Sequence, residues 1–270
     1  MATTGSKDTY LSSIDPEAMT ILLSRLEVVT SRDCAGDATK INNHVDATLR
    51  TIIKKTGNLK APPAFDLPPT LRDLPFRLFH LRRGPLLGVM LQHADDIDVV
   101  QNQFLYASPE SSRKHIQPQL FEAVALEDTG QNQPQLGFRE LPAENLVLRS
   151  IRVLLFDDET NIYVWSGSET VGPQYDLLRA ACLSWAGHLS ETRFPRPVVM
   201  SFKEGESMAR FLNCRLSVLH KDQPAEQEKI LPELKTLSAE ERKKLSSKFF
   251  RTDEFSFLEY CRWLSSEKTA

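Results

Sequence analysis

Cysteine is scarce in this sequence, with four residues in 270. None of them forms a C-x-x-C pair, and no histidine–cysteine group has zinc-binding spacing, which argues against a zinc site and against a disulfide framework. The pattern is typical of reduced, mostly buried thiols in a cytosolic protein. The four residues are Cys34, Cys182, Cys214 and Cys261.

Long apolar runs and a strong charge of one sign are also missing. No stretch approaches the ~20 apolar residues of a membrane-spanning helix, and residues 1–13 lack the apolar core of a signal peptide. The formal net charge of −3 gives no sign of a nucleic-acid partner. With 41% apolar and 26% charged residues, the composition predicts an ordinary soluble globular protein.

The motifs of self-contained enzymes are absent as well. The sequence has no G-x-S-x-G, no H-E-x-x-H and no glycine-rich phosphate loop. Of the six scattered histidines, His80 lies in the apolar run LFHLRR and is interpreted as a packing residue. Asp95 and Asp96 are interpreted as charges that favour a helix start rather than as metal ligands. We therefore expect no metal, no cofactor and no enzymatic activity of the chain by itself.

What the sequence does contain, up to about residue 115, is a series of amphipathic helices. In residues 13–29, Asp15 is the predicted N-cap and Pro16 the first helical residue. Residues 37–55 repeat apolar side chains at the helical period and predict a second helix. A proline-rich connector follows at 58–70. Further helices are predicted at 74–92, with a break at Gly84–Pro85, and at 95–108. The predicted buried stripes are Met19, Leu22, Leu23 and Leu26 in the first helix, and Ile41, Val45, Leu49, Ile52 and Ile53 in the second.

After residue 115 strand signals alternate with helical ones. Residues 120–128 and 136–141 are short and extended in pattern, and 146–158 with 161–167 predict a hairpin around a turn at Asp157–Thr160. A helix at 175–189, a strand at 196–202 and a helix at 203–218 follow, which favours a compact α/β module. The tail is charged and helical, with a capping box at Ser238 and Glu241. An aromatic last helix, with Phe255, Leu258 and Trp263, is predicted to dock on the body.

Four arginines are candidate site residues. In KEGESMARFLNCRLSV (203–218), Arg210 lies opposite an apolar side formed by Met208, Phe211, Leu212 and Leu216. The pattern alone favours a role of Arg210 in solubility. The alternative is that Arg210 is an exposed cation that binds a partner. Arg82 and Arg83 in FHLRRG are candidate partner-binding residues, although a helix C-terminus also explains them. Arg193 in TRFPRPVVM is a further candidate partner-binding residue. The alternative is a structural role at the start of the strand that follows.

The motifs LFHLRRG, HIQPQL, TRFPRP, EGESMARFLNCRL and RTDEFSFLEYCRWL occur together and in this order. In this respect residues 12–265 resemble the C-terminal part of the GTPase-activating subunit of the inner COPII vesicle coat, the Sec twenty-three family. The resemblance implies an α plus α/β fold: a helical domain at 8–115, a gelsolin-like module with a central sheet between helices at 116–220, and a tail at 221–270 that ends in a docking helix.

The resemblance also implies a role for Arg210. In the family, the arginine of the ARFL motif enters the active site of a small Sar-type GTPase as an arginine finger. The implied partners are that GTPase, the cargo-binding sister subunit and the outer-coat scaffold subunit. The implied location is the cytoplasm, on the cytosolic face of the endoplasmic reticulum membrane and of COPII vesicles, where the chain would be peripheral to the membrane through the coat.

The sequence departs from the family in two ways. The zinc-binding module with its two C-x-x-C pairs, the trunk and the β-sandwich are not in this sequence, so we expect a fragment, a split gene product or a divergent paralogue. The segment between LSVLH and RTDEF is long, charged and helical, whereas the family usually has an irregular loop there.

Two other functions stay open at this point. One is a coat scaffold of the same fold without GTPase-activating activity. The other is a gelsolin-like actin-regulatory protein, for which Asp157, Asp158 and Glu159 would be candidate calcium ligands.

Overall fold

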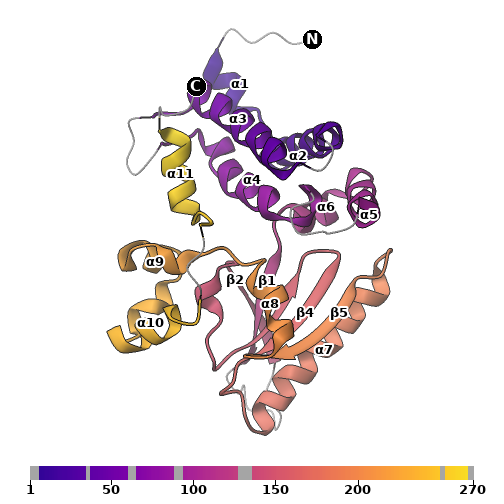
Figure 1. Cartoon of the computed structure of the whole chain (residues 1–270), viewed down its shortest axis with the longest axis vertical. Helices are drawn as coiled ribbons and strands as arrows, with labels where there is room; N and C mark the ends of the chain where they lie inside the picture. The colour runs from indigo at the N-terminus through magenta and orange to yellow at the C-terminus, as the bar shows by residue number, and fades with distance from the viewer. Residues whose placement is uncertain are drawn as a thin grey trace. The chain divides into compact units, whose positions relative to one another are not determined.

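The computed structural model describes residues 6–34, 37–59, 65–87, 94–126, 136–249 and 253–266 (Figure 1). The chain divides into two units, one formed by residues 1–117 with 257–270 and the other by residues 118–256. The first unit is helical and the second is built on a β-sheet. In the described part of the chain, no helix combines the length and the apolar character that a membrane crossing requires.

Several helices of the first unit begin where the sequence supplies caps. Asp15 accepts hydrogen bonds from the backbone N–H groups of Glu17 and Ala18 at 2.9 and 2.8 Å, as predicted, and Ser108 caps a later helix through the N–H of Ser111. The elements are α1 (Lys7–Ser12), α2 (Pro16–Asp33), α3 (Ala38–Thr56), η1 (Pro69–Leu71), α4 (Leu74–Arg83), η2 (Pro85–Leu87), α5 (Ala94–Leu105), α6 (Pro109–Ile116) and α11 (Phe257–Ser265).

Helix α3 buries the face that its sequence predicts, because Ile41, Val45, Leu49 and Ile53 are all at most 4% exposed. The predicted break after α4 is also confirmed, since the α-helix ends at Arg83 and a short 3-10 turn follows at Pro85–Leu87. The remainder of that predicted helix, residues 88–92, lies outside the described residues.

The stripe predicted for α2 is wrong. Leu22 and Leu26 are 64% and 54% exposed, whereas Ser24 and Glu27 on another face of the helix are buried. The buried carboxylate has partners there: Glu27 accepts hydrogen bonds from Thr48 and His44. Because these contacts satisfy Glu27 on the inward face, that face of the helix is buried and the leucines are left in solvent, an outcome that hydrophobic periodicity does not capture.

The last helix docks as predicted, and it does so on the helical unit. Helix α11 packs against α3 and α4, where Phe257 contacts the Phe76 ring at 5.0 Å between centroids. The Tyr260 hydroxyl donates a hydrogen bond to Asp46 at 2.6 Å, and Tyr260 is fully buried. The chain therefore returns to its first unit after completing its second.

The second unit contains one five-stranded sheet in the order β2-β1-β3-β4-β5. All neighbouring strands are antiparallel except β4 and β5, which are parallel. The predicted hairpin is confirmed as β3–β4, with Leu154 opposite Trp165 and Phe156 opposite Tyr163. The strands are β1 (Gln119–Ala125), β2 (Leu136–Leu141), β3 (Val153–Asp157), β4 (Asn161–Ser166) and β5 (Val198–Lys203). Predicted strand residues 127 and 128 lie outside the described residues.

Helices cover both faces of this sheet. Residues of β3 and β4 alternate between the two faces, so Leu155 and Val164 pack toward α7 (Pro173–Thr192), whereas Leu154 and Trp165 pack in a second core. The second core is completed by α8 (Arg210–Asn213), α9 (Pro224–Ile230) and α10 (Ala239–Ser246), with the short turns η3 (Asn145–Val147), η4 (Ser207–Ala209), η5 (Leu219–Lys221) and η6 (Pro232–Thr236). Helix α10 begins at the predicted capping box of Ser238 and Glu241.

The predicted fold class is therefore confirmed. A helical region comes first, a gelsolin-like module with a central sheet between helices follows, and a helix ends the described chain (Figure 1).

One ion pair after β5 gives the sheet unit a pH dependence. Burial disfavours the Glu204 carboxylate, but hydrogen bonds from Lys248 at 2.5 Å and from Ser168 outweigh burial and lower its pKa to about 2 from an ordinary 4.5. Since folding favours the ionised form, this contribution to stability is complete above about pH 4.5 and is lost as the pH falls toward 2.

We expect Glu204→Gln to lower the melting temperature at pH 7, and the difference from the parent to shrink at pH 3. Thermal melts of both chains at the two pH values measure this. Glu169→Gln, an exposed glutamate of the same unit, is the control and should show no such pH-dependent difference. An equal loss of stability at pH 7 and pH 3 would contradict the assignment.

Candidate functional site

The candidate site lies on the short segment between β5 and the end of α8. A turn follows β5, in which Gly205 has a φ of +87°, a left-handed conformation that favours glycine. Glu206 closes this turn by accepting a hydrogen bond from the backbone N–H of Lys203 at 3.0 Å. Next come the 3-10 turn Ser207–Ala209 and the α-helical turn Arg210–Asn213.

The helix predicted at 203–218 is much shorter than its sequence pattern indicates. Its physical end is set by the backbone of Ser217, which exchanges hydrogen bonds with Asn145 and Ala143 at 2.9 Å each. These bonds hold the chain in a bridge beside residue 144, so helical pairing cannot continue beyond Asn213. Tertiary pairing has here overridden the local helical pattern.

Arg210 points away from the core that holds its helix. Ala209, Leu212 and Leu216 are buried at 6%, 0% and 0% exposure, and Phe211 packs partly against the same core. The Arg210 side chain is exposed, and its guanidinium carbon lies 5.4 Å from the centroid of the Phe211 ring. Among the described residues, no carboxylate pairs with it and no hydrogen bond is made by its side chain. The geometry leaves all five N–H donors of a permanently charged fork available.

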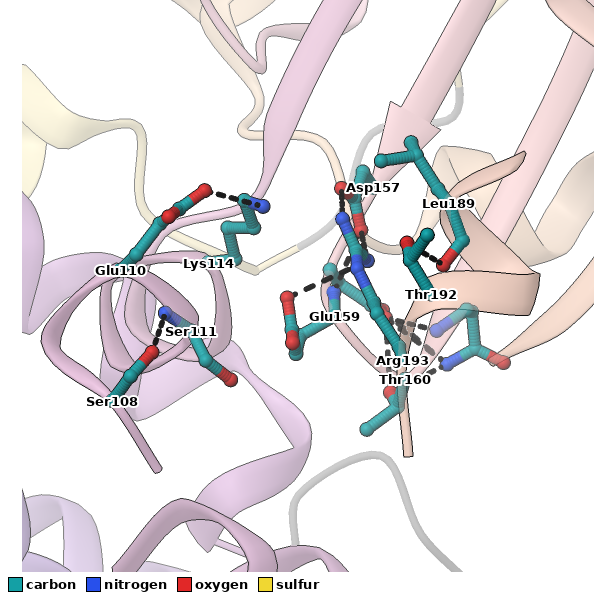
Figure 2. Close-up of polar contacts among 12 residues, drawn as sticks. Ser108, Glu110, Ser111, Lys114, Asp157, Glu159, Thr160, Leu189, Thr192 and Arg193 are labelled. Carbon is teal, nitrogen blue, oxygen red and sulfur yellow. Dashed lines mark hydrogen bonds and ion pairs between the residues drawn. The ribbon is translucent and has the colours of Figure 1, made fainter. Parts of the chain in front are cut away.

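Arg193, a second candidate from the sequence, is held inside the sheet unit. Its guanidinium donates to both carboxylate oxygens of Asp157, at 2.7 and 2.6 Å, and lies 3.4 Å from Glu159 (Figure 2). Its side chain is 11% exposed. The structure thus gives Arg193 a stabilising contact at the β3–β4 turn, and a partner-binding role for it stays a prediction.

The arginines of FHLRRG are also engaged within the chain. Arg82 lies 3.2 Å from Asp46, with its guanidinium 5.0 Å from the centroid of the Tyr260 ring. Arg83 is 9% exposed and lies over the ring of Phe79. A partner-binding role for these two residues likewise stays a prediction.

We expect Arg82→Ala to destabilise the helical unit by about 3 kcal/mol, because it leaves the buried Asp46 carboxylate without its cation. Burial already raises the pKa of Asp46, despite the opposing effects of Arg82 and Tyr260. Thermal and urea unfolding measure the change, with the exposed Arg72→Ala as a control. An unfolding free energy of Arg82→Ala equal to that of Arg72→Ala would show that the contact with Asp46 contributes little to stability.

The acidic residues proposed above as calcium ligands are paired with arginines. Arg193 pairs with Asp157 and Glu159, and Arg215 pairs with Asp158 at 2.9 Å. In the described ranges, no group of three or more histidine, cysteine, aspartate or glutamate side chains is arranged to hold a metal ion. The geometry at this turn therefore gives no support to a calcium-dependent actin-binding function.

Sequence reasoning missed Arg215, which is largely buried beside α8 with an 11% exposed side chain. A signal was present, because a helical wheel of 203–218 places Arg215 between Met208 and Phe211 on the apolar side. A charge on the buried face of a helix predicts a buried partner of opposite charge, and that partner is Asp158.

Comparison with known proteins finds sequence relatives of this chain. The chain is 36% identical to "Protein transport protein SEC23 A" of Arabidopsis thaliana over 271 residues, which covers 99% of this chain and 29% of the relative. The chain thus spans less than a third of the length of the curated relative it matches. No family model matches the chain.

Solved structures show the fold. The human COPII-coat protein Sec24c matches 84% of this chain and 33% of its own chain, with a TM-score of 0.56 and 13% sequence identity. A Thorarchaeota 2DGel3/rabbit actin complex matches 37% of this chain and 46% of the solved chain at 19% identity, but its TM-score of 0.30 is too low to support an argument.

Proposed function

The chain belongs to the SEC23/SEC24 family of COPII coat proteins, and from this premise we propose that it stimulates GTP hydrolysis by a Sar-type small GTPase through Arg210. The proposal includes peripheral association with the cytosolic face of the endoplasmic reticulum membrane through the coat. Its partners there would be the GTPase, the cargo-binding sister subunit and the outer-coat scaffold subunit. The chain would act on the GTPase in trans and would have no catalytic cycle of its own.

One observation carries the proposal: Arg210 is exposed and unpaired among the described residues, while the residues around it are anchored in a core. In GTP hydrolysis the transition state spreads negative charge over the phosphoryl oxygens. A guanidinium delivered from another protein neutralises that charge with paired hydrogen bonds and is worth roughly 10³–10⁵ in rate. An arginine finger must be exposed on its own protein and must not be paired with a carboxylate of that protein. Arg210 meets both conditions among the described residues.

The length of the match supports one alternative. The chain matches 29% of its Arabidopsis relative, and in the alternative this part provides the coat with a folded scaffold and does not hold a GTPase. In this case the chain would bind coat partners without any effect on GTP hydrolysis.

Single-turnover GTP hydrolysis by a Sar-type GTPase distinguishes the two functions. The assay is run with the GTPase alone, with this chain added, and with this chain plus the segment of the Arabidopsis relative that precedes the matched region. We expect the hydrolysis rate to rise on addition of the chain, and to rise at lower concentration when the preceding segment is present. An unchanged rate in both mixtures would leave only the scaffold function.

A further inference from the structure

Arg215 connects the helix that carries Arg210 to the β3–β4 turn. Its Nε donates a hydrogen bond to Oδ2 of Asp158 at 2.9 Å, and its Nη1 donates to the backbone oxygen of Phe211, also at 2.9 Å. The same guanidinium lies 5.1 Å from the centroid of the Tyr163 ring in β4. One planar side chain thus contacts the turn, the sheet and the end of α8.

The turn that receives Arg215 is itself well fixed. Oδ1 of Asp158 accepts hydrogen bonds from the backbone N–H of Asn161 at 2.7 Å and from the Thr160 hydroxyl at 2.9 Å. The Asp158 side chain is 5% exposed. Because one carboxylate oxygen organises the turn and the other receives Arg215, the turn provides a rigid anchor for whatever Arg215 holds.

Helix α8 needs such an anchor. It contains four residues, which is a single helical turn, and a turn of this length has little stability of its own in water. The carbonyl groups at its end lack helical partners, and Arg215 satisfies the one belonging to Phe211, the residue that follows Arg210. Leu212 and Leu216 hold the buried side of the segment, but apolar contacts do not fix its rotation as directional hydrogen bonds do.

We infer that Arg215 and Asp158 form a positioning pair that sets the direction in which Arg210 projects from α8. The inference rests on the function proposed above. Arg215 is too buried to reach a partner itself, so its effect passes through the backbone of Phe211 to the neighbouring Arg210. A displacement of a catalytic group by about 1 Å can cost roughly 10²-fold in rate.

A double-mutant cycle between Arg210 and Arg215 tests the inference, using single-turnover GTP hydrolysis at saturating concentrations of the chain. We expect Arg215→Ala to slow stimulated hydrolysis by about 10- to 100-fold, and to have no further effect when Arg210→Ala is already present, since there is then no finger to position. Arg215→Lys keeps the charge beside Asp158 but lacks the fork that also reaches Phe211, so an intermediate rate is expected.

Two further variants separate positioning from a loss of stability. Asp158→Asn keeps the size of the side chain and removes its charge, which weakens the Arg215 contact while the turn can keep its hydrogen bonds. Arg152→Ala removes another buried arginine of the same unit, one that pairs with Glu122 and Glu233 and not with α8. Thermal melts establish that each variant is folded at the assay temperature. Asp158→Asn should slow hydrolysis, and Arg152→Ala should lower the melting temperature while leaving hydrolysis intact.

The outcomes distinguish this inference from the proposed function. If Arg210→Ala itself leaves the rate of hydrolysis unchanged, Arg210 is not an arginine finger, and the positioning role of Arg215 and Asp158 is rejected as well. If Arg210→Ala slows hydrolysis but Arg215→Ala does not, or slows it equally in both backgrounds, the finger stands and the positioning pair is overturned. A loss of hydrolysis in Arg152→Ala equal to that in Arg215→Ala would also overturn it, since stability alone would then explain the effect.

Discussion

Replacement of Arg210 by alanine is expected to lower the stimulated rate of GTP hydrolysis by about 10³-fold or more, to the level of the GTPase alone. A factor of 10³ corresponds to about 4 kcal/mol of transition-state stabilisation. Arg210→Lys should recover little of it, because an ammonium group keeps the charge but cannot form paired hydrogen bonds with two phosphoryl oxygens.

The same substitution is expected to leave folding unchanged. The side chain is exposed and, among the described residues, makes no ion pair, so the change in unfolding free energy should stay within about 0.5 kcal/mol. Arg196→Ala removes an equal charge from an exposed position of the same unit and should leave hydrolysis at the parent rate. Hydrolysis at the parent rate by Arg210→Ala, with or without the preceding segment of the relative, would rule out the finger.

Replacement of Arg193 by alanine is expected to lower the unfolding free energy of the sheet unit by about 3–5 kcal/mol. The variant leaves Asp157, which is 2% exposed, without the guanidinium that binds both of its oxygens. Glu159, 7% exposed, loses the same neighbour. Removing one member of a buried ion pair costs far more than removing a surface charge, because the remaining carboxylate stays desolvated.

Urea unfolding followed by tryptophan fluorescence measures this change, since Trp165 and Trp185 lie in the sheet unit. Arg193→Lys should lose less, because it keeps a cation near Asp157 with poorer geometry. Arg196→Ala again provides the exposed control. A loss in Arg193→Ala no larger than in Arg196→Ala would mean that the Asp157 contact contributes little to stability.

Parts of the fold could be predicted because local sequence and tertiary structure agree there. Helix α3 has apolar residues at the helical period and buries them, and the β3–β4 hairpin has β-branched and aromatic residues on both sides of a turn. The capping box at Ser238 works through contacts three residues apart, which a sequence displays directly.

The errors fall where distant groups decide the local structure. Glu27 is buried in α2 because Thr48 and His44 of α3 satisfy its carboxylate, and no pattern within α2 announces those partners. The helix that carries Arg210 ends early because Ser217 pairs with residues more than 70 positions away. Such long-range hydrogen bonds are absent from any local window of sequence.

The candidate site was predictable to a different extent. The wheel of 203–218 predicts only that Arg210 lies away from the apolar side, and the role proposed for it comes from the resemblance. The anchoring of its helix by Arg215 and Asp158 joins residues 57 positions apart. Only the folded chain shows that the turn of one hairpin holds the end of a helix beyond the next strand.

The return of α11 to the helical unit bears on how this protein is made. The residues of α11 leave the ribosome after those of the sheet unit, and Tyr260 fills the core beside Asp46, a residue synthesised more than 200 positions earlier. The amino-terminal unit therefore has to wait, incomplete, while the entire sheet-containing unit is translated. Synthesis of the helical unit begins before that of the sheet unit, but the helical unit can complete its folding only after the sheet unit has been synthesised.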